Sequence, residues 1–437
     1  MNEIIQLQIG QCGNQIGSNF WKTISDEHGI NESGEIIQSY NIHLDRICVY
    51  YNESSNKKYV PRAVLIDLEP GTLESIGSGY KCKFSHQNFI SGITGAGNNW
   101  AKGYNLDGIE MLDRVLNTVR LEAEKCDCLQ GFQITHSLGG GTGSGLGSRL
   151  MSKIQQIYPK RMISSFSVVP SSKVSDTIVE PYNALMAMEH LICDVQGVHL
   201  IDNSALFDVC RCKLNLTSPT YGDLNHLVAQ TMSGVTTGFR FSGPGRQQQM
   251  IGDLKTLITN MVPLPKLHFF TSGLAPLTYR TQSSRTGLSL EDVVGHLADP
   301  KRLLVSCDTG RCLAAALMFR GSNEMCPIEV NKLVYRGLLI DFVEWIPDNV
   351  KTFIYRGLPS HGLKVSGTIM TNGTNSKGIF QRVLKLYSRL MSRKAFLHLY
   401  TEQGLEINDF QQAEEQIKSL IADYLECEKT SCSSGQN

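Results

Sequence analysis

The chain has 437 residues, of which 41% are hydrophobic and 19% are charged. It is long enough for about three domains of ~150 residues, and its composition excludes disordered, fibrous and membrane-spanning proteins. The 41 Lys and Arg residues balance the 41 Asp and Glu residues, so the net charge is zero. This balance argues against non-specific binding to nucleic acid and leaves self-association unopposed. We therefore expect neither nucleic acid nor a membrane as a partner.

The 13 cysteines are scattered and odd in number, which is typical of reduced thiols in a cytosolic protein. No basic segment followed by an apolar one opens the sequence, so we expect a protein of the cytoplasm. The close pairs Cys126/Cys128 and Cys210/Cys212 could in principle hold a metal, but no histidine cluster accompanies them. Buried thiols are the favoured interpretation.

Strand patterns alternate with helical patterns in the first half of the chain. Alternating or continuous apolar runs predict strands at residues 5–9, 64–68, 132–134 and 165–169. A glycine-containing loop and a helical stripe follow the first and the third of these strands. This order predicts an α/β fold in which residues 1–204 form a Rossmann-like, doubly wound parallel sheet that binds a nucleotide.

The pattern changes after residue 204. Strand-like pieces at 267–271, 314–319 and 352–355 alternate with loops rich in Gly, Ser, Thr and Pro. We expect residues 205–375 to form a mixed α/β intermediate domain that begins with a connecting core helix. Residues 376–437 should form a C-terminal helical domain, with helices at 376–393 and 409–426 and a short tail that is not acidic.

The strongest local signal is the segment Ser137–Gly145, in which five of the last seven residues are glycine. Each glycine costs about 1 kcal/mol inside a helix or strand, so the segment predicts a loop. Between a strand and a helix, its amides can close on a phosphate, and the helix dipole adds attraction. A flexible linker is the alternative, but linkers do not usually interrupt a strand–loop–helix unit.

Familiar nucleotide and hydrolase motifs are absent. There is no G-x-x-x-x-G-K-[ST], no G-x-G-x-x-G and no G-x-S-x-G, which argues against a P-loop, a dinucleotide site and a hydrolase elbow. Other loops should converge at the same sheet edge: Gly10–Gly13, the carboxylates Asp67 and Glu69, and Gly95–Asn99. Each is weak alone, but together they suggest a nucleoside triphosphate with Mg²⁺.

These loops resemble the signature segments of tubulins. The resemblance runs from residue 1 to about 426, and Cys12 and the short loop at 362–374 are similar to β-tubulins. It implies the tubulin fold and a site for GTP or GDP with Mg²⁺. The residues implied to bind GTP are Gln11, Cys12, Glu69, Asn98, Ser137, Gly141, Thr142, Gly143, Asp176, Glu180, Asn203, Tyr221 and Asn225.

The resemblance gives these residues separate roles. Glu69, with Gln11 and Asp67 nearby, would organise Mg²⁺ partly through water. The phosphates would be held by Gln11, Cys12, Asn98, Ser137 and the residues from 139 to 145, with Thr142 near the terminal phosphate. Asp176 and Glu180 would lie by the ribose. The guanine base would be read by Asn203 and Asn225 and stacked on by Tyr221.

The resemblance also implies a structural GTPase whose active site is completed by a neighbour, so no catalytic residue is expected in this chain. It would pair with α-tubulin and further dimers in a cytoskeletal filament and could meet microtubule-associated proteins. Thr256 stands where α-tubulins carry the glutamate that positions water against a neighbour's nucleotide.

Four departures from the family pattern concern contact surfaces. Segment 242–252 is longer and carries Ile251, Arg285 replaces a tyrosine at the lateral contact, 79–84 is shorter and more basic, and the tail has two acidic residues and one lysine. We expect altered lateral association and weak attraction for partners that use an acidic tail.

Two other functions stay open: a tubulin-like nucleator or assembly regulator that binds GTP without forming the bulk lattice, and a free-standing nucleotide enzyme.

Overall fold

The structure is a computed structural model that describes residues 2–37, 46–54, 56–79, 84–171, 177–242, 252–278, 288–306, 310–321, 325–338, 340–357, 359 and 363–429. Several sequence predictions lie outside these residues. They concern Asp176, Ile251 with most of its long loop, Arg285, the basic segment 80–83 and the tail from residue 430.

Within the described residues, ten strands form one sheet in the order β11-β10-β12-β9-β8-β7-β6-β1-β4-β5. Their bounds are β1 (Glu3–Ile9), β4 (Ala63–Asp67), β5 (Phe89–Ser91), β6 (Leu129–Ser137), β7 (Met162–Val169), β8 (Gly197–Asp202), β9 (Phe269–Ala275), β10 (Cys312–Gly321), β11 (Val350–Arg356) and β12 (Val365–Gly373). Two short strands, β2 (Tyr51–Glu53) and β3 (Tyr59–Pro61), pair separately.

Neighbouring strands from β5 to β9 are all parallel, whereas β12 is antiparallel to both β9 and β10, and β11 is parallel to β10. The predicted α/β fold, with a parallel first half and a mixed second half, is confirmed. Every residue of β1 and β4 is buried, because helices cover both faces of the parallel part.

The helices of the first half are α1 (Gly10–His28), α2 (Pro70–Gly79), α3 (Asp107–Glu124), α4 (Gly147–Ile157), α5 (Glu180–Asp194) and α6 (Asn203–Cys212). Those that follow are α7 (Tyr221–Val235), α8 (Thr237–Arg240), α9 (Leu254–Met261), α10 (Leu290–Leu297), α11 (Pro327–Gly337), α12 (Lys377–Met391), α13 (His398–Thr401) and α14 (Ile407–Lys429).

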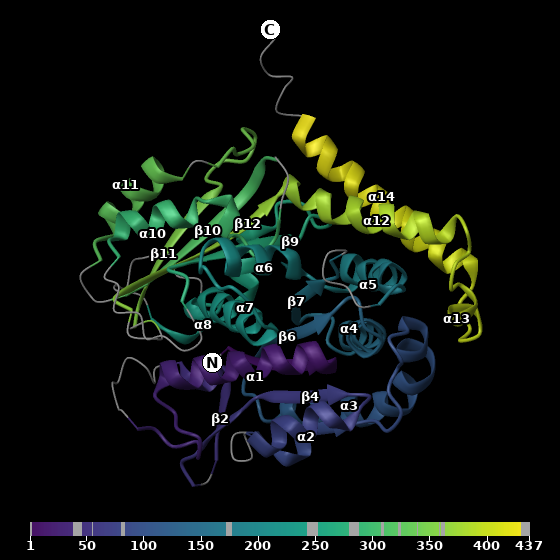
Figure 1. Ribbon diagram of the computed structural model, residues 1–437. Helices are drawn as coiled ribbons and strands as arrows, with labels where there is room; N and C mark the ends of the chain where they lie inside the picture. Colours follow the sequence, from purple (N-terminus) through teal and green to yellow (C-terminus); the bar gives the residue numbers. More distant parts are fainter. Residues whose placement is uncertain are drawn as a thin grey trace.

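Two large apolar clusters show how the helices cover the sheet. One cluster joins the sheet to α3, α4, α5, α12 and α14, and the other joins it to α1, α6, α7 and α9. Helices α12 and α14 pack on each other and on α5 along one side of the molecule (Figure 1). None of the described helices has the length and apolar character needed to cross a membrane.

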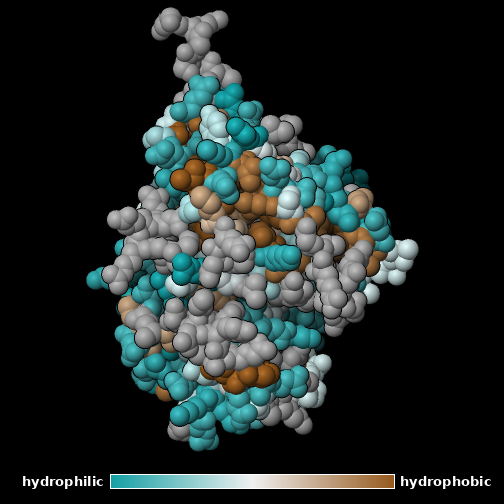
Figure 2. Space-filling view, turned by 90° about the vertical axis from the view of Figure 1, so that its left-hand side faces the viewer, coloured by the Kyte–Doolittle hydropathy of each residue, from teal (hydrophilic) through white to brown (hydrophobic). Residues whose placement is uncertain are grey.

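A third, smaller cluster packs α10 and α11 against the mixed part of the sheet. The face that carries these two helices shows a broad apolar area in its upper half (Figure 2).

Two local predictions were wrong. The segment Gly10–Gly13 is the first turn of α1 rather than a loop, because Gly10 turns the chain directly from β1 into the helix with a φ of +74°. The glycine-rich loop also ends early, since Thr142–Leu146 already forms a π-helical turn that leads into α4. The predicted terminal helices differ from α12 and α14 only at their ends.

The sheet continues across the predicted domain boundary at residue 204. β8 pairs with β9 at two positions, Val198 with Phe269 and His199 with Phe270. The division into three domains therefore stays a prediction. Its first boundary, at residue 204, falls where the short β8–β9 pairing continues the sheet.

Candidate functional site

The predicted nucleotide residues gather at the carboxyl ends of the parallel strands. Gln11 and Cys12 follow β1, Glu69 follows β4, Ser137 ends β6 and Asn203 follows β8. Because parallel strands end at one edge of a sheet, these segments lie along the edge where ligands of open α/β sheets bind.

The loop after β6 presents amide groups at this edge. Ser137 Oγ accepts a hydrogen bond from the Gly139 amide at 3.3 Å. The amides of Gly140, Gly141 and Thr142 have no backbone acceptor among the described residues. They lie at the start of the π-helical turn that leads into α4. The unpaired N–H donors and the positive end of the helix dipole therefore face the same space in front of the loop. This geometry suits a phosphate group.

Two glycines bring the first turn of α1 into contact with the glycine-rich segment after β6. A Cβ atom on Gly10 would lie 3.0 Å from the Gly143 amide nitrogen, so only glycine lets these two backbones approach so closely. Gln11 is exposed in the following turn and Cys12 is half-buried. Burial raises the pKa of the Cys12 thiol to about 12, so it is a neutral packing group rather than a nucleophile.

Two carboxylates lie beside the loop. Burial raises the pKa of Asp67 to about 6, and the Thr142 hydroxyl bonds this carboxylate and opposes the rise. Glu69 is exposed, and its Oε1 lies 2.3 Å from where a Cβ of Gly95 would stand. Gly95 has a φ of +70° and leaves this room.

These carboxylates fit a hydrated Mg²⁺. A buried carboxylate whose pKa is raised gains from a nearby cation, and Mg²⁺ keeps several waters. No group of three or more His, Cys, Asp or Glu among the described residues could hold a metal on its own. Water and phosphate oxygens would therefore have to complete the coordination, with Glu69, Gln11 and Asp67 supplying the protein side.

The loop after β5 places Asn98 with a φ of +55°, a conformation that asparagine tolerates better than most residues. Its backbone is held by Asn183 of α5, which the sequence analysis left without a role. The Asn183 Nδ2 atom donates to Asn98 O at 2.8 Å and to Gly139 O at 2.7 Å. Asn183 thus ties two of the predicted phosphate loops together. No local sequence pattern predicts this role of Asn183, because its two partners lie 85 and 44 residues away in the chain.

Among the described residues, those predicted to contact the nucleoside lie on three helices: Glu180 on α5, Asn203 on α6, and Tyr221 and Asn225 on α7. Glu180 opens α5 and packs against Gly139, where a Cβ would lie 3.2 Å from its Cδ. Tyr221 opens α7 and is half exposed, with its ring 6.0 Å from that of Phe207 on α6. Asn225 Nδ2 donates to Gln15 Oε1 of α1 at 3.5 Å. These helices bring Tyr221 and Asn225 near α6 and α1.

His136 lies directly beneath the glycine-rich loop and does not offer a base. Its Nδ1 donates to Gly143 O at 2.9 Å and its Nε2 faces Ser167 Oγ at 2.8 Å, both buried. Burial lowers the pKa of His136 to about 4, so the ring is neutral and supports the loop from below.

Residues 3–211 match the Tubulin/FtsZ family GTPase domain, and residues 265–385 match the tubulin C-terminal domain. The chain belongs to the tubulin family. The GTPase-domain match spans the loops that meet at the strand ends, from Gly10 to Asn203, and implies that this tubulin-family chain binds GTP or GDP and has GTPase activity.

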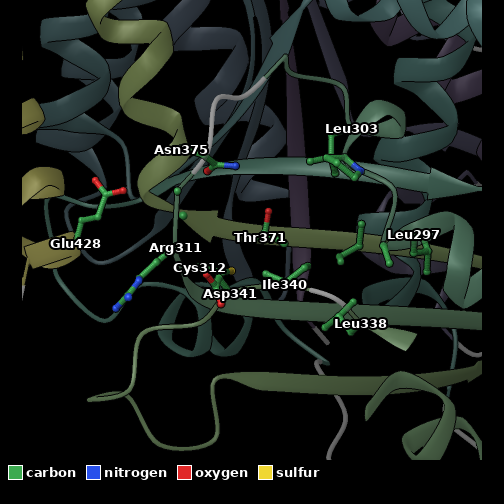
Figure 3. Close-up of a pocket in the computed structure, with 15 residues that line it drawn as sticks. Leu297, Leu303, Arg311, Cys312, Leu338, Ile340, Asp341, Thr371, Asn375 and Glu428 are labelled. Carbon is green, nitrogen blue, oxygen red and sulfur yellow. The ribbon is translucent and has the colours of Figure 1, made fainter. Parts of the chain in front are cut away.

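A large hollow among the described residues lies elsewhere. It measures about 870 Å³ and lies between the ends of α10, β10, β12 and α14. Leu297, Leu303 and Leu338 lie on one side, and Arg311, Asn375 and Glu428 on the other (Figure 3). It contains none of the predicted nucleotide residues.

Proposed function

We propose that this tubulin-family chain is a β-tubulin-like structural subunit that pairs with α-tubulin and polymerises into microtubules or related filaments of the cytoplasm. GTP with Mg²⁺ would occupy the strand-end site and be hydrolysed when the next α subunit docks. The observation that carries the proposal is the chemistry of the strand-end site. Its glycine-rich segment has amides without backbone acceptors among the described residues, and carboxylates lie beside it. The nearby His136 is neutral and hydrogen-bonded to the segment, so it does not act as a base. Such a site can hold a nucleotide and needs a neighbour to complete it.

Apolar side chains at both ends of α14 support end-to-end assembly. Near its start, Phe396 and Leu399 are 40% and 38% exposed in a segment bonded to the nucleotide loops. Near its end, Trp345 and Leu264 are 44% and 38% exposed and line a hollow with Cys427. A helix of 23 residues is ~34 Å long, so the two apolar surfaces are well separated. Two different surfaces of this kind suit head-to-tail contacts, which build filaments.

Thr256 supports the β-like role. It lies exposed in the first turn of α9, where its amide donates to the cap residue Asp253 at 2.8 Å. A threonine is neither acidic nor a base at neutral pH. This subunit would therefore not activate hydrolysis of a nucleotide that its own α9 covers.

A nucleator or assembly regulator is the second candidate. The replacements at Ile251 and Arg285 favour it, because both fall in predicted contact loops. The amount of this chain that co-sediments with polymerised tubulin would decide between the two candidates. A lattice subunit would co-sediment in stoichiometric amounts, whereas a nucleator would do so only in trace amounts.

The central test is GTP turnover against concentration, with the chain purified together with its α subunit. We expect bound guanine nucleotide on this subunit and turnover that rises steeply only once filaments form. A dimer without guanine nucleotide here, or equal turnover per subunit when dilute, would reject the proposal. The second result would instead favour a free-standing enzyme.

A further inference from the structure

The segment 394–405 lies along the predicted phosphate loops, although its partners Asn99 and Asn105 precede the residues they bond by 300 and 298 positions. Asn99 Nδ2 donates to Leu399 O at 2.8 Å, and Asn105 Nδ2 donates to Gln403 O at 2.8 Å. From α5, the Tyr182 hydroxyl donates to Ala395 O at 2.9 Å. Three side chains of the nucleotide-binding half therefore hold the backbone of this one segment.

A fourth link runs from the segment into the site itself. The Tyr400 hydroxyl is buried and donates to Asn183 Oδ1 at 2.6 Å. The same Oδ1 accepts from the Trp100 amide at 2.9 Å, while Nδ2 donates to Asn98 O and Gly139 O. The buried Asn183 amide thus uses both donors and both acceptor positions. Its orientation is fixed, because a flipped amide would set its donors against an N–H group and its oxygen against two carbonyls.

This arrangement makes Asn183 sensitive to Tyr400. A shift of the tyrosine hydroxyl moves the Asn183 side chain, which bonds both Asn98 and Gly139, and a fully engaged buried amide has no spare partner. Tyr400 cannot move alone, since its ring packs on Tyr182 and Phe410 at 5.3 and 5.7 Å between centroids. Motion of the segment therefore reaches the loops through Tyr400.

The outer side of the same segment is built for contact. Phe396 and Leu399 expose apolar surface, and Lys394 and Phe396 both have positive φ, at +50° and +58°. Positive φ strains a residue with a side chain, and such strain persists only where the surroundings hold it. The hydrogen bonds described above supply that hold from the inner side.

We propose that Tyr400 and Asn183 are positioning residues that couple the apolar docking segment 394–405 to the two phosphate loops. Occupation of the loops by a guanosine polyphosphate orders the segment. A subunit seated on Phe396 and Leu399 in turn tightens the loops on the nucleotide. The two effects are equal in free energy, because coupling between two binding sites is reciprocal. This inference rests on the proposed function for the identity of the nucleotide and of the docking subunit.

The chain offers a matched pair of variants. Tyr400→Phe removes the hydroxyl that reaches Asn183. Tyr182→Phe removes a hydroxyl that reaches the same segment at Ala395 but does not bond Asn183. Both changes delete one oxygen and keep the ring, so a general loosening of the segment should affect both alike.

The experiment measures hydrogen exchange of 394–405 in the full chain, purified with its α subunit and kept below the assembly concentration, with and without GDP. In the parent protein we expect GDP to slow exchange in this segment. Tyr400→Phe should abolish that response and weaken GDP binding on the order of fivefold, as expected for one lost hydrogen bond. Tyr182→Phe should keep both the response and the affinity.

The results that overturn the coupling are distinct from those that reject the proposed function. If GDP binds but does not change exchange at 394–405 in the parent protein, the coupling does not exist. Equal responses in the two variants, whether both kept or both lost, would also exclude the path through Asn183. Failure of the parent protein to bind GDP at all would reject the proposed function instead.

Discussion

At the scale of single residues, Asp67 is a carboxylate of the candidate site whose ionisation is opposed by its burial. It ends β4, is 3% exposed, and its pKa is raised from 3.8 to about 6 by burial. The native state thus binds this proton more tightly than the unfolded chain does. Its ionisation therefore destabilises the nucleotide-free protein progressively as pH rises from about 4 to about 6, and the cost is complete at pH 7.

Asp67→Asn should accordingly stabilise the nucleotide-free protein. We expect a gain of about 3 kcal/mol in unfolding free energy at pH 7, which vanishes below about pH 3, where Asp67 is protonated in both the native and the unfolded state. The same variant should lose much of the Mg²⁺ dependence of GTP binding. Denaturant unfolding and nucleotide titration would measure the two effects. Asp208→Asn, at an exposed position of α6, is the control; an equal gain there would contradict the explanation.

At the scale of elements, the buried carboxylate of Glu27 joins α1, α8 and β10. Glu27 of α1 lies 2.7 Å from Arg240 Nη1 of α8 and 2.8 Å from Arg320 Nη1 of β10. Burial opposes ionisation of Glu27, but Arg320 and Arg240 outweigh it and hold the pKa of this carboxyl at about 2. The paired carboxylate stabilises the fold above about pH 4.5, and this contribution is lost as pH falls toward 2.

Glu27→Gln should be strongly destabilising, because it leaves two buried guanidinium groups without their shared negative charge. We expect a loss of about 3–5 kcal/mol at pH 7. The difference from the parent should narrow as pH falls from 4.5 toward 2. Glu74→Gln, at an exposed site on α2, should have little effect. A pH-independent difference in melting would show that packing rather than charge is responsible.

At the scale of the whole molecule, Asp202 links the three predicted domains. It ends β8, its amide donates to Leu304 O at 2.9 Å, and Arg382 Nη1 of α12 donates to its Oδ2 at 2.7 Å. Its Oδ1 accepts from the Ser204 amide at 3.0 Å and caps α6, the helix that carries Asn203. The C-terminal helices are therefore anchored at the point where the predicted guanine-reading helix begins.

Arg382→Met should leave Asp202, which is fully buried, without its counter-charge. We expect a loss of about 3 kcal/mol in stability. The double variant Asp202→Asn with Arg382→Met should recover part of that loss, since it removes the unpaired charge as well. Urea unfolding of all four proteins would give the coupling energy. Strict additivity of the two single changes would mean that the pair contributes nothing to holding α12 on β8.

Local sequence patterns predicted much of the fold correctly. Alternating apolar residues located β1, β4, β6 and β7, because a strand buried on both faces needs apolar side chains along its length. They failed at Gly10 and at Thr142–Leu146, where glycines begin helical turns instead of extending a loop. Glycine frees the backbone, but only contact with neighbouring loops decides which conformation it takes.

The sequence by itself determined the order of strands, helices and glycine loops, and thereby the edge at which a nucleotide can bind. Each of these features depends on the pattern of apolar residues and glycines over a short stretch of chain, so it can be predicted from the local sequence. The tertiary structure alone decided that Asn183 joins two loops to Tyr400, and that Glu27 meets Arg240 from 213 residues away. Such contacts depend on how complete elements pack, since the position of each buried polar partner is fixed only once the sheet and its helices are assembled.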